Sequence, residues 1–159
     1  APQNPEFGLG AIASYGARYV DEDSLQALGL TADALEQIEQ RERQELHRRQ
    51  QAYRDELPPP RIGGRTVIVV DDGVATGGTV RAAIRAIRQL KPGRLVLAVP
   101  VAPPDTARTL GEEVDELVCP QTPSPFRAIG EWYRQFTQTT DEQVVDLLNA
   151  RREHAGVGE

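Results

Sequence analysis

The 159-residue sequence has a single lysine, Lys91, a single cysteine, Cys119, and no methionine. A lone cysteine excludes an internal disulfide and a cysteine-based metal site. Its neighbours, "DELVCP", indicate a small apolar residue at the end of a strand. The formal net charge of −6 disfavours non-specific attraction to nucleic acid or to an anionic membrane surface.

Long apolar runs are also missing, and none approaches the roughly 20 residues that a membrane-spanning helix needs. No signal-peptide pattern is visible, so we expect a cytoplasmic protein. The chain opens "APQNPEFGLG" without a methionine, which indicates a processed terminus or a piece of a longer protein.

Strand and helix patterns alternate along the chain and predict an α/β fold with an open, mainly parallel, doubly wound sheet. We expect one domain over residues 1–150 and a flexible tail over 151–159. The expected strands are an early one within 7–14, then 67–70, "LVLAVPV" and "VDELVCP". The expected helices are 31–56, 79–90, a short one in "PPDTARTLGEE", and 140–150.

Several of these elements carry end or burial signals. Thr31 can cap the first long helix, whose many charged residues form i,i+4 pairs and predict a mostly solvated surface. Thr140, followed three residues later by Gln143, is typical of a capping box. The apolar run 67–70 does not alternate with polar residues, which favours a central parallel strand covered on both faces.

The stretch "VIVVDDGVATGGTV" at 67–80 joins that strand to a helix through two adjacent carboxylates and a loop of small residues. In an open parallel sheet, ligands bind beyond the carboxyl ends of the strands, which is where Asp71 and Asp72 fall. The loop glycines let backbone N–H groups approach a ligand, and the following helix adds partial positive charge at its N-terminus. The loop therefore suits a phosphate, while the carboxylates suit hydroxyl groups or a hydrated Mg²⁺.

Other motifs fit the chain less well. A Walker B strand needs a lysine-containing phosphate loop, and a receiver domain needs a lysine after a later strand, but Lys91 is the only lysine. "GLGAIA", with Gly8, Gly10 and Ala13, is a partial dinucleotide-binding pattern that no strand-like segment precedes. Asp23, with Asp21, has phosphatase-like spacing, although a turn is the simpler interpretation.

The motif "VIVVDDGVATGGT" resembles the phosphoribosyl pyrophosphate motif of type I phosphoribosyltransferases. In that motif, apolar residues precede two acidic residues, a small loop and T-G-x-T. The runs "NPEFGLGAI", "PVAPPDT" and "WYRQFTQTTDEQVVDLL" extend the resemblance over essentially the whole chain, to a bacterial subgroup of undefined substrate. The resemblance implies the type I phosphoribosyltransferase fold, with a long charged helix and a C-terminal hood.

The resemblance also implies an activity, the transfer of phosphoribose from phosphoribosyl pyrophosphate to a nitrogenous base, with Mg²⁺ as cofactor. Asp71 and Asp72 would be the catalytic pair, holding the 2- and 3-hydroxyls of the ribose and, through water, the metal. The 5-phosphate would lie in the loop 75–79. The implied substrate-binding residues are Asp71, Asp72, Gly73, Val74, Ala75, Thr76, Gly77, Gly78 and Thr79.

The acceptor base would lie under the hood, "PFRAIGEWYRQF". The rings that could stack on it are those of Phe126, Trp132, Tyr133 and Phe136, for which core packing is the alternative role. Ala75 stands where hypoxanthine–guanine enzymes carry an aspartate, which argues against a 6-oxopurine handled in that way. Tyr53 and Arg54 fall in the region of the family's mobile loop.

One departure from the family pattern bears on activity. Type I enzymes carry a further strand and a pyrophosphate-binding loop, which this subgroup has upstream of "NPEF", so the chain looks N-terminally incomplete and inactive by itself. Two alternatives stay open: a non-catalytic sensor of phosphoribosyl pyrophosphate or of a nucleotide on the same fold, and an interaction domain that self-associates through the charged helix. A homodimer is compatible with each, and no nucleic-acid or membrane partner is expected.

Overall fold

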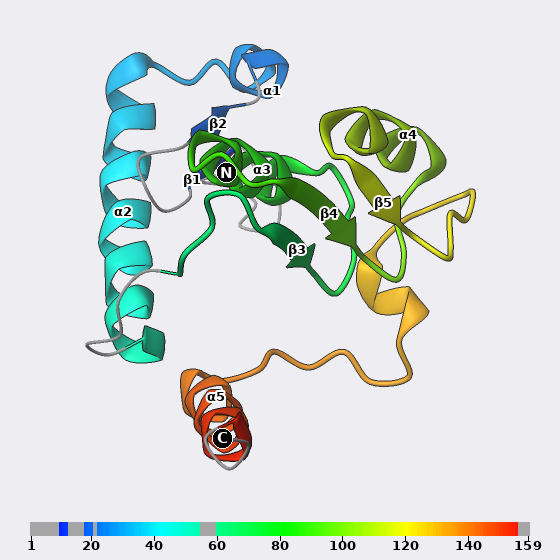
Figure 1. Cartoon of the computed structure of the whole chain (residues 1–159). Coiled ribbons are helices and arrows are strands. Elements are labelled where there is room, and N and C mark those ends of the chain that lie inside the picture. Colours follow the sequence, from blue (N-terminus) through cyan, green and yellow to red (C-terminus); the bar gives the residue numbers. More distant parts are fainter. Residues whose placement is uncertain (1–9, 13–17, 21, 55–59, 156–159) are drawn as a thin grey trace.

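Three parallel strands form the central sheet, in the order β3-β4-β5 (Figure 1). β3 spans Thr66–Val70, β4 spans Arg94–Ala98 and β5 spans Glu116–Val118. Our computed structural model describes residues 10–12, 18–20, 22–54 and 60–155 of the chain. Within them, the parallel sheet and its helices confirm the predicted α/β fold.

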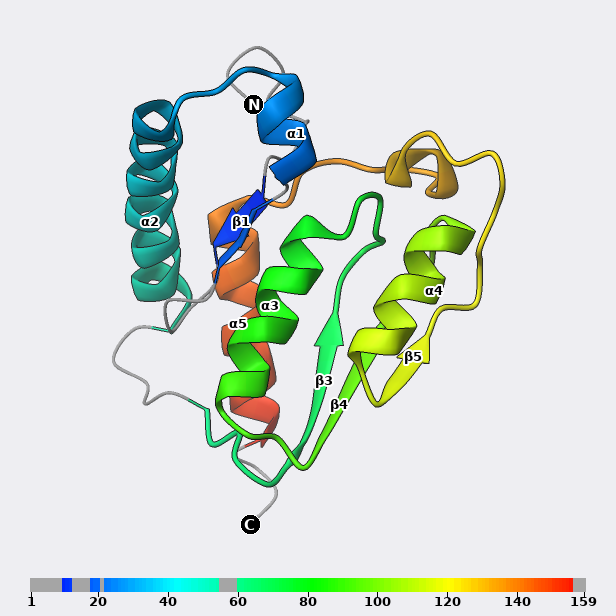
Figure 2. The same cartoon turned by 90° about the horizontal axis from the view of Figure 1, so that it is seen from above.

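Two helices cover one face of this sheet, α3 at Gly78–Gln89 and α4 at Pro104–Glu113 (Figure 2). The apolar residues of α3 recur at helical spacing, which turns one stripe of the helix toward the strands. The core lies between these layers. Its buried residues are Val74, Val80, Ile84, Leu95, Leu97, Val99, Ala102, Ala107, Leu110 and Val114.

The other face of β3 is exposed, which corrects the prediction of a central strand covered on both faces. Ile68 is 60% exposed and Val70 is 74% exposed, whereas Val67 and Val69 pack against the core. Successive side chains of a strand point to opposite faces, so an unbroken apolar run presents apolar groups to both sides. In the described sheet β3 lies at an edge and pairs only with β4.

The N-terminal part contains a small antiparallel sheet of β1, Gly10–Ile12, and β2, Arg18–Val20. β1 lies within the predicted early strand, the rest of which falls outside the described residues, as do Gly8 and Ala13. A short helix that the sequence patterns did not predict, α1 at Glu22–Ala27, follows β2. Asp23 therefore lies in a helix and not in a turn, while Asp21 is outside the described residues.

α2 spans Ala32–Arg54 and begins as predicted, since the N–H of Ala34 donates a 3.2 Å hydrogen bond to Oγ1 of Thr31. Most of its side chains are exposed. Its charged residues form ion pairs within the helix, and the hydrogen bonds from Arg48 and Arg49 lower the pKa of Glu45 to about 2. No described helix is long and apolar enough to span a membrane.

The last helix, α5 at Asp141–Ala155, lies on the opposite side of the central sheet from α3 and α4 and contacts α2 (Figure 1). The predicted capping box is confirmed. The N–H of Gln143 bonds Oγ1 of Thr140 at 3.3 Å, and the N–H of Thr140 bonds Oε1 of Gln143 at 3.0 Å. Asp141 joins α5 to α2, because its carboxylate accepts a hydrogen bond from the hydroxyl of Tyr53 and pairs with Nη1 of Arg48 at 2.6 Å.

Candidate functional site

The acidic pair lies directly beyond the carboxyl end of β3, at the sheet edge where the sequence places it. The side chain of Asp71 is half-buried and that of Asp72 is exposed. The N–H of Asp72 donates a 3.0 Å hydrogen bond to Oδ1 of Asp71. Burial raises the pKa of the Asp71 carboxyl above its usual range; the hydrogen bond from Asp72 opposes this, and the negative charge of Asp72 adds to it. The pair is therefore suited to a ligand that supplies positive charge or hydroxyl donors.

The loop between the acidic pair and α3 is held from its buried side. The side chain of Val74 is in the core, and its N–H donates a 2.9 Å hydrogen bond to the carbonyl of Val101. Neither the side chain nor the N–H of Val74 is therefore free to face a ligand. Ala75, Thr76 and Thr79 are exposed.

The loop ends at Gly77, the N-cap residue of α3, with φ of 85° in the left-handed region. Glycine adopts this conformation without steric cost. An added Cβ at Gly77 would also approach Nη1 of Arg81 to 3.0 Å. A left-handed residue beside a turn is the backbone arrangement from which anion-binding nests are built, and it precedes the positive end of the α3 dipole.

Two side chains that the sequence patterns did not single out bind the outer side of this loop. The hydroxyl of Thr106 donates a 3.0 Å hydrogen bond to the carbonyl of Ala75, and Nη1 of Arg81 donates a 2.9 Å hydrogen bond to the carbonyl of Thr76. The sequence held a signal for Thr106 only, because Thr106, Thr109 and Glu113 share one face of a predicted helix. Arg81 contacts that face through Thr109 and Glu113.

The predicted hood lies beside the acidic pair, beyond the carboxyl end of β3 (Figure 2). It contains a 3₁₀ helix at Ile129–Trp132, which packs so closely on Gly73 that an added Cβ would lie 2.7 Å from Cγ2 of Ile129. The hydroxyl of Tyr133 donates a 2.6 Å hydrogen bond to the carbonyl of Asp72. The hood therefore contacts the acidic pair and the first residue of the loop.

The aromatic side chains of the hood form two pairs. The rings of Phe126 and Trp132 stack with centroids 6.4 Å apart, and those of Tyr133 and Phe136 tilt at 38° with centroids 5.2 Å apart. Trp132 is 45% exposed and Phe136 is 50% exposed, so these rings are not simple core residues. Tyr53, in contrast, bonds Asp141 between α2 and α5, and Arg54 is the last residue of α2.

The acidic pair fits Mg²⁺ through its donor atoms. In the part of the chain that the structure describes, no group of three or more His, Cys, Asp or Glu side chains could hold a metal ion. Mg²⁺ is commonly bound by one or two carboxylates together with substrate phosphates and water. A cation near Asp71 would also offset the effects of burial and of Asp72 that raise the pKa of Asp71. Two adjacent carboxylates thus match a metal that arrives with its substrate.

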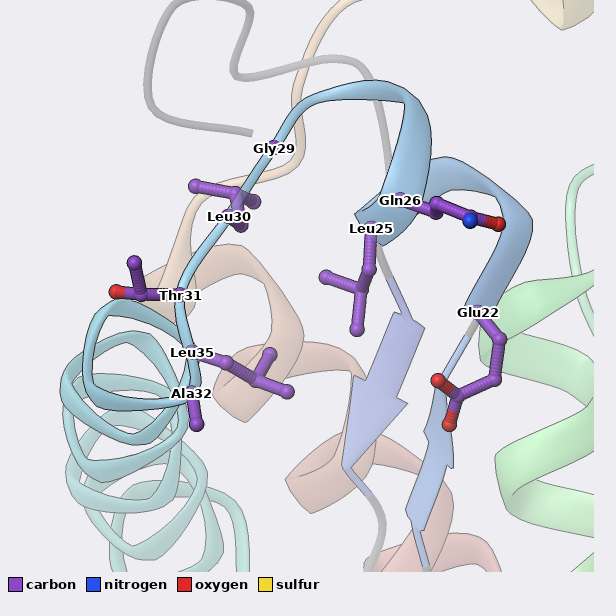
Figure 3. A pocket seen from close by; sticks show the side chains of 8 residues that line it. All are labelled: Glu22, Leu25, Gln26, Gly29, Leu30, Thr31, Ala32 and Leu35. Atoms are coloured by element: carbon purple, nitrogen blue, oxygen red, sulfur yellow. The ribbon is translucent and has the colours of Figure 1, made fainter.

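A separate hollow of roughly 640 Å³ lies between α1 and α2 (Figure 3). Leu25 of α1 and Leu35 of α2 point into the space between the helices, and Glu22 lies at the α1 end. None of its lining residues belongs to the acidic pair, the loop or the hood.

The fold is an α/β domain with a candidate ligand site at the carboxyl edge of a parallel sheet, where such folds bind ligands. The family model of the phosphoribosyl transferase domain matches residues 16–136, and the chain belongs to this family. The matched segment includes the acidic pair, the loop and the hood. The suspected membership of the family is confirmed.

Two curated relatives from Mycobacterium tuberculosis are named for the same family. A Mycobacterium tuberculosis protein named "Putative phosphoribosyl transferase" is 39% identical over 161 residues, which cover 99% of this chain and 36% of that protein. The chain thus spans 36% of the length of the first curated relatives that it matches. The "Bifunctional protein PyrR" of Chloroflexus aurantiacus is 48% identical over 61 residues, 30% of this chain and 34% of that protein.

A solved structure supports the fold. The crystal structure of TT1426 from Thermus thermophilus is 38% identical and superposes with a TM-score of 0.69, covering 93% of this chain and 70% of that chain. The arrangement described above is therefore consistent with the type I phosphoribosyltransferase fold.

Proposed function

We propose that the protein containing this chain is a phosphoribosyltransferase that uses phosphoribosyl pyrophosphate and Mg²⁺ to transfer phosphoribose to a nitrogenous base. The observation that carries the proposal is the junction between β3 and α3. A half-buried carboxylate, an exposed carboxylate and a glycine-rich turn follow one another there at the carboxyl edge of the sheet. Membership of the phosphoribosyl transferase domain family supports the same class of reaction.

The two parts of the junction have different roles in this proposal. Asp71 and Asp72 accept hydrogen bonds from the ribose 2- and 3-hydroxyls, and the loop 75–79 binds the 5-phosphate. Binding this remote phosphate supplies the energy that positions the reacting carbon. As pyrophosphate leaves the anomeric carbon, positive charge develops on the ribose ring, and the nearby carboxylates stabilise that charge.

When bound, Mg²⁺ would neutralise negative charge on the departing pyrophosphate. Asp71 and Asp72 are the residues that would hold it, through water. The hood rings, above all Tyr133 and Trp132, would lie over the acceptor base, since Tyr133 already contacts the backbone of the acidic pair. The exposed ring faces of the hood suit stacking on a flat heterocycle.

Calorimetry with phosphoribosyl pyrophosphate and Mg²⁺ on the full-length protein tests the binding step. Because each carboxylate makes charged hydrogen bonds to the sugar, Asp71→Asn and Asp72→Asn should each weaken binding by roughly ten- to a hundredfold. Asp146→Asn is the matched control, since this aspartate is exposed on α5, away from the junction. Wild-type protein that does not bind the ligand contradicts the proposal.

A screen of nitrogenous bases, followed by pyrophosphate release, tests turnover. Release that depends on one base identifies the acceptor and establishes the enzyme. Tight binding of phosphoribosyl pyrophosphate without release for any base would instead support the second candidate, a sensor on the same fold.

A further inference from the structure

In the loop that is proposed to bind the 5-phosphate, the carbonyl groups of Ala75 and Thr76 accept hydrogen bonds from side chains. Oγ1 of Thr106 donates to the carbonyl of Ala75 at 3.0 Å, and Nη1 of Arg81 donates to the carbonyl of Thr76 at 2.9 Å. Both peptide bonds are trans, because within the described residues the only cis bond joins Ser124 and Pro125. In a trans peptide the N–H points away from the C=O.

Holding these two carbonyls therefore sets the direction of the next two amides, those of Thr76 and Gly77. Both N–H groups face away from Thr106 and Arg81. Among the described residues, neither N–H donates a hydrogen bond to a protein acceptor. Two adjacent free N–H groups, pointed away from the scaffold that fixes them, form the geometry of a backbone anion site.

The surroundings of Arg81 indicate that its guanidinium is part of the scaffold and not a ligand. Nε pairs with Oε1 of Glu113 at 2.8 Å, and Nη2 bonds Oγ1 of Thr109 at 3.0 Å. The guanidinium also lies 5.7 Å from the centroid of the Tyr19 ring, and the side chain is only 17% exposed. Its charge is compensated by Glu113, and each of its three nitrogens is occupied.

We propose that Arg81 and Thr106 are positioning residues that orient the amides of Thr76 and Gly77 toward the 5-phosphate, so that the anion site exists before the ligand binds. This inference rests on the proposed function and adds to it the residues that make the loop competent. Preorganised donors bind developing or existing negative charge without a cost of reorientation. Without either hydrogen bond, the peptide group that it holds can rotate, and the N–H of Thr76 or of Gly77 is then no longer oriented toward the phosphate.

The tests compare variants of the full-length protein. Thr106→Val removes only the hydroxyl at nearly constant shape, and Arg81→Lys keeps the charge but cannot make the three directed contacts. Thr106→Ser restores the hydroxyl. Arg88→Lys is the matched control, because Arg88 is also on α3 and pairs with Asp115 at 3.1 Å, and within the described part of the chain its side chain bonds Glu113 and Asp115 and not the loop.

Two readouts are needed. Calorimetry with ribose 5-phosphate should show roughly tenfold weaker binding for Thr106→Val and Arg81→Lys, and near wild-type affinity for Thr106→Ser and Arg88→Lys. NMR spectra should show the amide signals of Thr76 and Gly77 moving on addition of ribose 5-phosphate in the wild type and much less in the two weakened variants. Thermal midpoints, recorded alongside, show whether each variant is folded.

The outcomes separate this inference from the proposed function. If the wild type binds ribose 5-phosphate and folded Thr106→Val and Arg81→Lys bind equally well, the positioning role is overturned while the function stands. If Arg81→Lys fails to fold, Thr106→Val alone decides, with Thr106→Ser as its rescue. If the wild type binds neither ribose 5-phosphate nor phosphoribosyl pyrophosphate, the proposed function fails and the positioning role fails with it.

Discussion

The hydroxyl of Tyr133 donates a 2.6 Å hydrogen bond to the backbone carbonyl oxygen of Asp72. This contact joins residues that are 61 positions apart in the chain and holds the hood against the acidic pair. Tyr133 therefore has two separable parts. Its ring could stack on a base, and its hydroxyl holds the backbone of Asp72, a residue proposed to bind the sugar. Together with the packing of Ile129 on Gly73, this bond would set the position of the base relative to the ribose.

Tyr133→Phe separates the two parts, because it keeps the ring and removes the hydroxyl. We expect a loss of folding stability of no more than about 1 kcal/mol, since the contact is partly solvated. Binding of phosphoribosyl pyrophosphate should weaken severalfold, because the backbone at Asp72 loses its support. Tyr133→Leu, which removes the ring as well, should further weaken binding of the acceptor base. Calorimetry with each ligand measures both effects, and wild-type affinities for Tyr133→Phe would contradict the positioning role of the hydroxyl.

Gly73→Ala tests the packing of the hood on the acidic pair. The added Cβ would lie 2.7 Å from Cγ2 of Ile129 and 3.0 Å from Cγ1 of Val101, so the hood must shift. We expect a destabilisation of about 1–3 kcal/mol, measured by urea unfolding. Adding Ile129→Ala to the variant should relieve the clash at the hood. Gly63→Ala is the control, because its Cβ would meet nothing closer than the carbonyl of Leu90 at 3.5 Å. Equal effects at both glycines would contradict the close contact.

Local patterns were enough to predict most of the fold. Thr31 and Gln143 lie in caps of the predicted kinds, and the elements alternate as expected, because these features depend on residues close together in the sequence. The exposure of Ile68 and Val70 could not be predicted in the same way. An apolar run does not reveal whether a neighbouring strand or helix is present to cover each face.

The candidate site shows the same difference between local patterns and contacts of distant segments. Asp71 and Asp72 were placed correctly at the sheet edge, because a strand followed by two carboxylates fixes their position locally. Arg81 contacts the carbonyl of Thr76 only 5 positions away, but Thr109, which also bonds Arg81, is 28 positions away. The contacts of Thr106 with Ala75 and of the Tyr133 hydroxyl with Asp72 span 31 and 61 positions. Such contacts follow from the packing of α3, α4 and the hood, which no single segment encodes.

Asp115 provides a test of pH dependence away from the site. Its carboxylate accepts a 2.6 Å hydrogen bond from the N–H of Leu95 and pairs with Arg88. The hydrogen bond from Leu95 and then that from Arg88 lower the pKa of Asp115 in the folded chain. A lowered folded-state pKa means that the stabilisation is fully present above the unfolded value of about 4 and is lost as the pH falls below it.

Asp115→Asn should therefore be less stable than the wild type near neutral pH, and the difference should shrink as the pH falls below about 4. Urea midpoints of the two proteins, measured across that range, check the prediction. Asp146→Asn, at an exposed position on α5, should show no comparable change. A difference between wild type and Asp115→Asn that stays constant with pH would contradict the assigned cause.

The exposed side chains of Ile68 and Val70, on the outer face of β3, can be tested by substitution. An exposed apolar edge strand is a template for association between chains, and Ile68 and Val70 supply such a surface here. Replacing both with Thr preserves β propensity, so we expect stability to change by less than about 0.5 kcal/mol per site while self-association, measured by sedimentation velocity, decreases. The matched pair on the inner face is Val67→Thr and Val69→Thr, which should cost about 1–3 kcal/mol because these residues pack against the core. If the outer pair costs as much as the inner pair, that face of β3 is covered in solution, which would contradict the exposure of Ile68 and Val70.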